Sequence, residues 1–367
     1  MKKLYILTIY LFLSTVYIHA QTTDVVTGAF DPTGLFLSGN ELYYSEVNNE
    51  ADGAGIISKI DDITANTITT STVVSTAEGL LSQPWGILIV GNDLYIANFG
   101  DGIIYKKDIS APNDPDNGLT PIATGLDGPN GLAIKGDLLY ISEFGNNIPN
   151  AGKISTLDIT TNTHTPDVIT GLTTPSGMVF NGDDLYVSNF DEDLIYKIDI
   201  NDPLNYQIAI SGSNLSEPDG LFLDGNTLYI ANYGGAKISK TDILTPVTSL
   251  EPSFITTGDN PAFMVVTNNF MYITEQAPDK ITKFDLSTAS VNDFNTSKIS
   301  MYPNPAKDFI NISGLTTDQK YQITNVLGKT VQMGEVLQGK NIDINNLQKG
   351  VYFVKLDNGI SLKLLKD

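Results

Sequence analysis

The chain has 367 residues, no cysteine, and 42 acidic against 21 basic residues, a formal net charge of −21. Without cysteine there are no disulfides, so an apolar core must hold the fold, and a chain of this size can build one. Residues 21–298 hold 36 acidic residues against 11 Lys, which disfavours nucleic acid or anionic membrane as a partner and favours cations, although excess acid could also serve only solubility.

Residues 1–20 have the features of a secretory signal peptide. Lys2 and Lys3 precede an apolar run from Leu4 to Ile18, and Ala20 supplies a small residue before the expected cleavage site. A membrane anchor is the alternative, but the run is shorter than the ~20 apolar residues that a spanning helix needs. No later segment is long and apolar enough to span a bilayer, so we expect an exported mature chain without a transmembrane segment.

From residue 22 the chain repeats one pattern six times. Each copy has a Pro-led turn, a short apolar run, a turn of Gly with Asn or Asp in five of the six copies, and a second strand that opens with Leu-Tyr or, once, Met-Tyr. The copies begin at Pro32, Pro84, Pro129, Pro175, Pro218 and Pro261. A period of ~40–50 residues with strand-type alternation is typical of four-stranded β-propeller blades.

A fourth, outer strand precedes each Pro-led turn, and the first copy has one too, at Asp24–Gly28. The last copy ends near Ile281–Phe284 with no outer strand of its own. We therefore expect the N-terminal strand to complete the last blade, which would close the ring and remove both exposed edges. The prediction is an all-β, six-bladed propeller over residues 22–286, with an open solenoid as the alternative.

The repeat phrase Pro-Xaa-Gly-Leu…Gly-Asn…Leu-Tyr-Ile-Ala-Asn resembles that of the NHL and gluconolactonase-like group of six-bladed propellers. The resemblance covers roughly residues 24–286. It implies the architecture rather than an activity, because one propeller fold hosts many functions.

The pattern changes after a polar linker at residues 287–298. Residues 299–367 contain six short alternating strands, which predict a small β-sandwich. This tail resembles the type A C-terminal sorting domain of the type IX secretion system of Bacteroidetes, in the residues Tyr302, Pro303, Asn304, Pro305, Gly328, Lys329, Gly350, Tyr352, Lys363 and Lys366. The resemblance implies the secretion machinery as a partner and delivery through the periplasm to the cell surface or the medium. An accessory carbohydrate-binding sandwich fits poorly, because the tail has no Trp.

Two sets of residues should meet at one end of the blades, because strand direction alternates within a blade. The turn set follows the six prolines and consists of Thr33, Trp85, Asn130, Ser176, Asp219 and Ala262. The strand-end set closes the second strands and consists of Glu46, Asn98, Glu143, Asn189, Asn232 and Glu275. We expect a ring of carboxylates and amides at the channel mouth, although Asn and Asp also favour turns for backbone reasons alone.

Oxygen donors of this kind suit a hard cation such as Ca²⁺. Asn130 and Asp219 stand in Pro-Asn-Gly-Leu and Pro-Asp-Gly-Leu, which resemble the metal-ligand turns of gluconolactonase-type hydrolases. In that family the two turns fall in neighbouring blades, whereas here the blade between them carries Ser176. Glu143 is a possible third oxygen donor or general base.

Two functions follow as hypotheses. The first is an exported propeller that binds an unidentified small ligand or protein at its acidic mouth, where Trp85, the only Trp, could stack on a ligand or pack on a neighbouring turn. The second is a metal-dependent lactonase or esterase. A Ser-His-Asp triad is disfavoured, because His164 is the only His after the signal peptide, and there is no Cys nucleophile.

Overall fold

The computed structural model describes residues 22–48, 53–76, 79–110, 118–145, 148–212, 214–244, 250, 253–289, 300–313, 319–325, 329–336, 340–356 and 361–367. Its contacts divide the chain after Ser287 into two units. The predicted signal peptide lies outside the described residues, as does most of the predicted linker. Within the described ranges, no helix has the length and apolarity needed to cross a bilayer.

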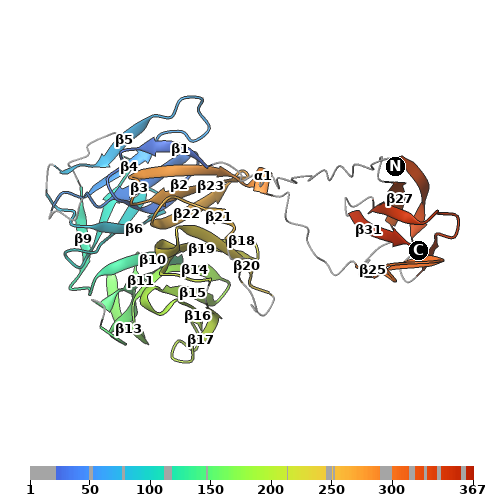
Figure 1. Cartoon of the computed structure of the whole chain (residues 1–367). Coiled ribbons are helices and arrows are strands. Elements are labelled where there is room, and N and C mark those ends of the chain that lie inside the picture. Colours follow the sequence, from blue (N-terminus) through green and yellow to red (C-terminus); the bar gives the residue numbers. More distant parts are fainter. Residues whose placement is uncertain are drawn as a thin grey trace, which may run out of the picture. The chain divides into compact units, whose positions relative to one another are not determined.

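The first unit is a ring of six four-stranded antiparallel sheets, as predicted (Figure 1). In blades 1 to 5 the strands follow chain order from the inner to the outer edge, and neighbouring inner strands lie side by side around the ring. Blades 1 to 3 comprise β2 (Pro32–Ser38), β3 (Glu41–Glu46), β4 (Ile56–Ile60) and β5 (Thr70–Val74); β6 (Pro84–Val90), β7 (Asp93–Asn98), β8 (Ile103–Asp108) and β9 (Thr120–Thr124); and β10 (Pro129–Lys135), β11 (Leu138–Glu143), β12 (Gly152–Asp158) and β13 (Thr163–Leu172).

The second half of the ring repeats this plan. Blades 4 to 6 comprise β14 (Pro175–Asn181), β15 (Asp184–Asn189), β16 (Leu194–Asp199) and β17 (Gln207–Ser211); β18 (Pro218–Asp224), β19 (Thr227–Asn232), β20 (Lys237–Asp242) and β21 (Ile255–Thr256); and β22 (Pro261–Thr267), β23 (Phe270–Glu275) and β24 (Lys280–Asp285). Two short 3-10 helices, η3 (Phe190–Glu192) and η4 (Tyr233–Gly235), follow β15 and β19, and the short helix α1 (Leu286–Ala289) follows β24.

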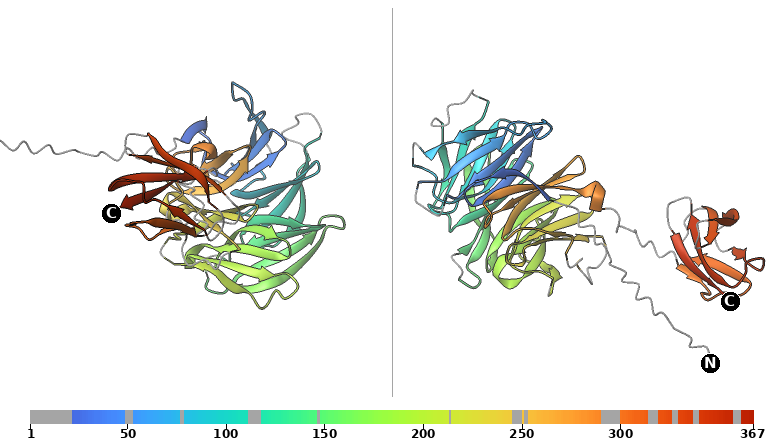
Figure 2. Two further views of the ribbon diagram at one scale, coloured as in Figure 1. Left: turned by 90° about the vertical axis from the view of Figure 1, so that its right-hand side faces the viewer. Right: turned by 45° about the horizontal axis from the view of Figure 1, so that its top comes forward.

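The N-terminal strand closes the ring. β1 (Thr22–Thr27) pairs antiparallel with β24, and Val26 lies opposite Ile281. The sixth sheet therefore has the order β1-β24-β23-β22, with the two ends of the unit in one blade (Figure 2). This pairing confirms the predicted closure. It covers the edge of β24 that would otherwise be unpaired, and it gives β1 a sheet to join.

The tight hairpins between first and second strands follow from residues that tolerate positive φ. Gly39, Gly91, Gly136, Gly182 and Gly225 all have φ between 57° and 61°. The sixth hairpin uses Asn268 and Asn269 instead, both with positive φ, and Asn is the non-glycine residue best suited to that region.

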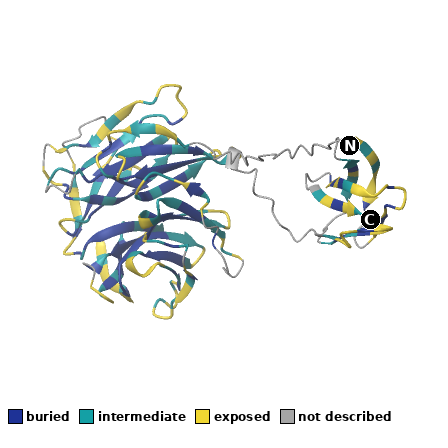
Figure 3. Cartoon of the chain, in the orientation of Figure 1, coloured by how far each residue is buried: buried dark blue, intermediate teal, exposed yellow. Residues whose placement is uncertain are grey.

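Apolar side chains between adjacent sheets form the core of the ring. One buried cluster joins Tyr43 and Ile57 of blade 1 to Ile87 and Leu94 of blade 2, and similar clusters lie between the later blades. Burial is accordingly concentrated in the strands nearest the axis, while the outer strands are more exposed (Figure 3). Each fully buried Leu or Ile contributes roughly 1.5–3 kcal/mol, so the inter-blade layers hold the ring without disulfides.

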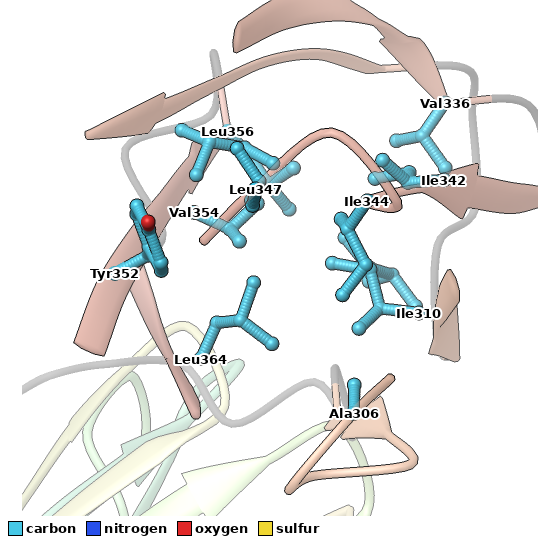
Figure 4. Close-up of a cluster of buried hydrophobic side chains, with 12 residues drawn as sticks. Ala306, Ile310, Val336, Ile342, Ile344, Leu347, Tyr352, Val354, Leu356 and Leu364 are labelled. Atoms are coloured by element: carbon cyan, nitrogen blue, oxygen red, sulfur yellow. The ribbon is translucent and has the colours of Figure 1, made fainter. Parts of the chain in front are cut away.

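The second unit has two small sheets around one apolar core (Figure 4). One sheet contains β25 (Ser300–Tyr302), β26 (Phe309–Ser313) and β29 (Asn341–Asp343); the other contains β28 (Thr330–Val336), β27 (Gln319–Asn325), β30 (Gly350–Leu356) and β31 (Ser361–Lys366). Ile310 and Ile342 from the first sheet share that core with Val354 and Leu364 from the second.

The residues that carry the resemblance to the sorting domain lie near the start of this unit, between β27 and β28, and on the last two strands. Asn304, between Pro303 and Pro305, joins the start of the unit to its last strand: its Nδ2 donates to the Lys363 carbonyl at 2.7 Å, and its Oδ1 accepts from the Leu365 amide at 2.8 Å. Tyr302 is half exposed. Tyr352 is buried and donates to the Gln348 carbonyl, Gly350 lies opposite Lys366, and the Lys329 amide donates to Asn325. Gly328 lies outside the described residues.

Candidate functional site

The inner strands begin at one end of the ring, which we term the Pro-turn face. In every blade the first-strand Pro lies opposite the last residue of the second strand, as Pro129 lies opposite Glu143. The turn set and the strand-end set therefore share this face. After each Pro the register shifts by a bulge, which re-aims the residue that follows it.

Neighbouring inner strands approach closely at this face, and the glycine of the Pro-Xaa-Gly turn permits it. A Cβ on Gly131 would lie 2.2 Å from the Ser176 carbonyl oxygen of the next blade, and Gly86 and Gly177 are as tightly placed. Hydroxyl groups connect the same points: Ser142 accepts from the Gly131 amide and donates to the Ser176 carbonyl, both at 2.7 Å. The turn-set residues are thus held at fixed positions around the axis.

Three members of the turn set form a hydrogen-bonded row across blades 3, 4 and 5, which we term the Asn–Ser–Asp row. The Ser176 hydroxyl lies 3.1 Å from Asn130 Oδ1 and also contacts Asp219 Oδ1. All three side chains are almost completely buried. Ser176 separates the two predicted metal ligands in sequence, and in the structure it connects them.

Asp219 is the only carboxylate of the row. Its side chain is fully buried, and its Oδ2 has no hydrogen-bond partner in the part of the chain that the structure describes. Burial raises the pKa of Asp219 to about 7, and the Ser176 hydrogen bond opposes this rise only in part. A hydroxyl has one hydrogen to donate, so Ser176 satisfies Asn130 and Asp219 together if the carboxyl group carries the other proton, or if Asn130 turns its NH2 group toward the hydroxyl.

The remaining turn-set residues differ from blade to blade. The Thr33 hydroxyl donates to the Pro84 carbonyl at 3.1 Å and is fully buried, so it serves the packing of blades 1 and 2. Ala262 is buried and carries no polar group. Trp85 is partly exposed and packs on Phe99, with ring centroids 6.0 Å apart.

The strand-end set is buried and makes hydrogen bonds within its own blade. The Glu46 carboxylate accepts from the Phe30 amide and from Ser58, and Glu275 repeats this with Gly258 and Thr282. Asn189 and Asn232 accept from the amides of Thr174 and Ser216 in the corresponding loops, while Asn98 donates to the Leu80 carbonyl. Either residue type can anchor the loop that precedes the Pro, because both offer a side-chain oxygen at this reach.

Glu143 follows this plan through one oxygen only, because its Oε1 is buried without a hydrogen-bond partner among the described residues. Its Oε2 accepts from the Asp127 amide at 2.9 Å and lies 3.7 Å from the Lys153 Nζ. Of the described residues, neither Asn130 nor Asp219 forms a hydrogen bond with Glu143. The structure therefore groups Asn130 and Asp219 with Ser176 and directs Glu143 to the loop of its own blade.

The residue after each strand-end position supplies a feature that the sequence analysis did not include. Four of these residues are aromatic and, with Trp85, form what we term the aromatic collar: Trp85, Phe99, Phe144, Phe190 and Tyr233. Neighbouring rings from blade 2 to blade 5 have centroids 5.5–5.9 Å apart, and the Tyr233 hydroxyl donates to Gln276 of blade 6 at 2.6 Å. Every ring is partly exposed.

The collar and the row lie at the same face. The amide of each collar residue on a strand end bonds to the residue just before the Pro, as Phe144 does with Gly128. Trp85 occupies the turn-set position of its blade and still reaches Phe99. In the sequence, the collar is visible only as the recurring pairs Asn-Phe, Glu-Phe, Asn-Phe and Asn-Tyr at the ends of the second strands. These pairs alone do not show that rings 43–46 residues apart will come into contact.

Comparison with known families identifies the tail. Residues 300–366 match the family described as secretion system C-terminal sorting domain. A search of the curated proteins found no match.

The comparison with solved structures supports the fold of the first unit. The chain is similar to a PQQ-bound aldose sugar dehydrogenase from Streptomyces coelicolor (15% identity, TM-score 0.53, 72% of this chain and 98% of that one). It is also similar to the calcium-binding protein regucalcin from Agrobacterium tumefaciens (13%, 0.54, 71% and 91%) and to a luciferin-regenerating enzyme (11%, 0.55, 72% and 94%). At these identities the similarity shows a shared propeller fold alone, because one fold hosts many activities.

Together these observations define the chain as a six-bladed β-propeller followed by a type IX secretion C-terminal sorting domain, which directs it to the outer surface or the medium.

Proposed function

We propose that this exported propeller binds a small organic ligand at the Pro-turn face without transforming it. The aromatic collar is the observation that carries the proposal. Five partly exposed aromatic side chains from four blades converge on one end of the ring. Aromatic groups contribute large contact areas to binding sites, and rings left partly open to solvent retain area for a ligand.

The polar groups beside the collar would orient the ligand. Asp219 has a buried oxygen that no other described residue bonds, and the Asn–Ser–Asp row offers both donors and acceptors. A few fixed polar groups among apolar walls are the usual composition of a small-molecule site. The row is buried in the protein without ligand. We therefore expect it to contact the part of the ligand that enters farthest.

A metal-dependent lactonase or esterase is the second candidate, supported by the oxygen donors of Asn130 and Asp219 and by the calcium-binding neighbour. The donor set fits a metal poorly. Ca²⁺ takes six to eight oxygen ligands, whereas the row offers one carboxylate, one amide and one hydroxyl, and the Glu143 Oε2 accepts from the Asp127 amide instead. Within the described residues no group of three His, Cys, Asp or Glu side chains could hold an ion. A rise in melting temperature on adding Ca²⁺, Mn²⁺ or Zn²⁺ would favour this candidate.

Trp85 makes the binding proposal directly testable, because it is the only Trp in the chain and belongs to the collar. Intrinsic fluorescence of the mature protein should change saturably on titration with a bound ligand, drawn from a panel of sugars, aromatic acids, amines and lactones. Phe144→Ala should abolish the change, whereas Phe180→Ala, which removes a partly buried ring packed on Tyr140 outside the collar, should retain it if the fold is intact. A panel without a single saturable response by fluorescence or calorimetry would refute the proposal.

A further inference from the structure

The collar and the charges around it point to a more specific ligand class. We propose that the Pro-turn face binds an organic cation, of the alkylammonium type, with its charged group on the axis inside the aromatic collar. This inference rests on the proposed binding function and adds the chemistry of the ligand.

The spacing of the collar suits a cation on the axis. In a regular hexagon, the centre is as far from each corner as neighbouring corners are from one another. Collar rings of adjacent blades have centroids 5.5–5.9 Å apart, so a group on the axis would lie about 6 Å from each centroid, which is the reach of a cation–π contact.

The orientation of the rings supports the same geometry. The planes of adjacent rings meet at 70°, 61° and 54°, close to the rotation of about 60° that relates adjacent blades of a six-bladed ring. The rings therefore stand along the axis instead of lying across it. A Cβ on Gly128 would come within 2.9 Å of the Phe99 ring edge, so Phe99 extends from its own blade toward the next one.

Charge around the collar favours a cation over a neutral ligand. Acidic residues stand in many of the loops that border the Pro-turn face, among them Asp31, Asp127, Asp191, Glu192, Glu217 and Asp259. Lys153, Lys237 and Lys280 lie in the first two residues of third strands at the same face, and two of them are ion-paired, Lys153 with Asp167 and Lys280 with Asp24. The net negative field would concentrate cations and repel anions.

Asp219 supplies the matching group beneath the collar. It occupies the position that Trp85 holds in blade 2, where the side chain reaches the collar. Its Oδ2 is fully buried and has no partner among the described residues. Burial of an unpartnered oxygen is unfavourable, and a cation bound at the collar would favour the ionised form of this carboxyl group. Quaternary ammonium groups are recognised by aromatic faces, and the acidic loops around the collar supply further negative charge.

A pair of ligands of equal shape tests the charge alone. Choline and its neutral isostere 3,3-dimethylbutan-1-ol would be titrated into the full mature protein, with Trp85 fluorescence and calorimetry as readouts. Choline should bind at least about tenfold more tightly, since a desolvated cation–π contact has a strength of that order. Its affinity should fall as NaCl is raised, because salt screens the field of the acidic loops.

Two substitutions separate the π contribution from bulk. Phe144→Leu keeps an apolar side chain of similar size but removes the ring face, so it should weaken choline several-fold and leave the isostere unchanged. Phe180→Leu, at a partly buried position outside the collar, should affect neither.

The possible outcomes distinguish the two proposals. Equal affinity for choline and the isostere, or binding only of neutral or anionic ligands from the panel, would refute the cation and leave the binding function intact. If neither choline, nor the isostere, nor any ligand of the panel binds the protein saturably, both proposals are refuted.

Discussion

The Ser142 hydroxyl of blade 3 donates to the Ser176 carbonyl of blade 4 at 2.7 Å while accepting from the Gly131 amide of its own blade. Ser45, Ser188 and Thr274 donate to the next blade in the same way, at 2.6 Å. The corresponding residues of blades 2 and 5 are Ala97 and Ala231, both fully buried. The position therefore accommodates either a hydroxyl or a methyl group. Exchanging Ser and Ala there changes one inter-blade hydrogen bond and little else.

Ser142→Ala should lower the free energy of unfolding by about 1–3 kcal/mol, because it leaves the buried Gly131 amide without its acceptor. Denaturant unfolding of the mature protein would measure the change. Ala97→Ser is the reciprocal variant and should be neutral or stabilising, since it offers a donor to the next blade. A neutral Ser142→Ala would show that water or a shifted strand replaces the hydroxyl.

Gly131→Ala should be far more damaging than a glycine substitution in a hairpin turn. A Cβ at Gly131 would meet the Ser176 carbonyl at 2.2 Å, and this atom belongs to the backbone of the next blade. Because both inner strands would have to separate, we expect a loss of roughly 3 kcal/mol or more.

Gly136→Ala is the matched control for this steric effect. Gly136 has φ of 59° and open space around it, so its substitution should cost only about 1 kcal/mol of backbone strain. Equal losses for the two variants would contradict the close approach of the inner strands.

The propeller could be predicted because its determinants are local and repeated. Each copy combines strand-type alternation with a turn residue that tolerates positive φ, and the missing outer strand of the last copy matches the spare strand near Asp24. The sorting domain was recognisable from Asn304 and its flanking prolines, which the structure places against Lys363 and Leu365 of the last strand.

The site could be predicted only in part. The turn set and strand-end set share a face because strand direction alternates, but the sequence does not show how far a side chain is buried. From the sequence, Asn189 and Glu143 could each be a ligand at the channel mouth or an anchor for a loop, because both roles need only a side-chain oxygen. The collar depends on contacts such as Phe144 with Phe190, which arise only when separate blades are placed around one axis.

The stability of the protein should depend on pH through Asp219. Burial raises its folded-state pKa to about 7, above that of an unfolded Asp near 3.9. Between these values the folded state binds more protons than the unfolded state, so stability should fall as pH rises from about 4 to about 7 and then level off. Differential scanning calorimetry at pH 5 and pH 8 would record the change.

Asp219→Asn is the control, because the amide keeps an oxygen for Ser176 and cannot ionise. The variant should gain stability relative to the original protein as pH rises, by a few kcal/mol at pH 8. An unchanged difference between the two proteins across this range would mean that Asp219 is ionised throughout.

Removal of β1 should open the ring. Deleting residues 22–27 would leave β24 as an unpaired edge and expose Ile281, which packs in the core cluster of blades 6 and 1. We expect a lower, less cooperative thermal transition and a tendency to aggregate. Asp24→Ala removes only the partly exposed ion pair with Lys280 and should have little effect. A truncated protein with the melting profile of the intact one would show that β1 does not close the ring.

Asn304→Ala should impair export by loosening the last strand of the sorting domain. Its side chain accepts from the Leu365 amide and donates to the Lys363 carbonyl, so the variant loses both bonds to β31. Asn311→Ala, which removes an exposed hydrogen bond to Asn341, is the matched control. Fractionation of cells that express each form should find the Asn304 variant retained in the periplasm and the Asn311 variant outside. Normal export of the Asn304 variant would show that docking of β31 through this side chain is not needed for sorting.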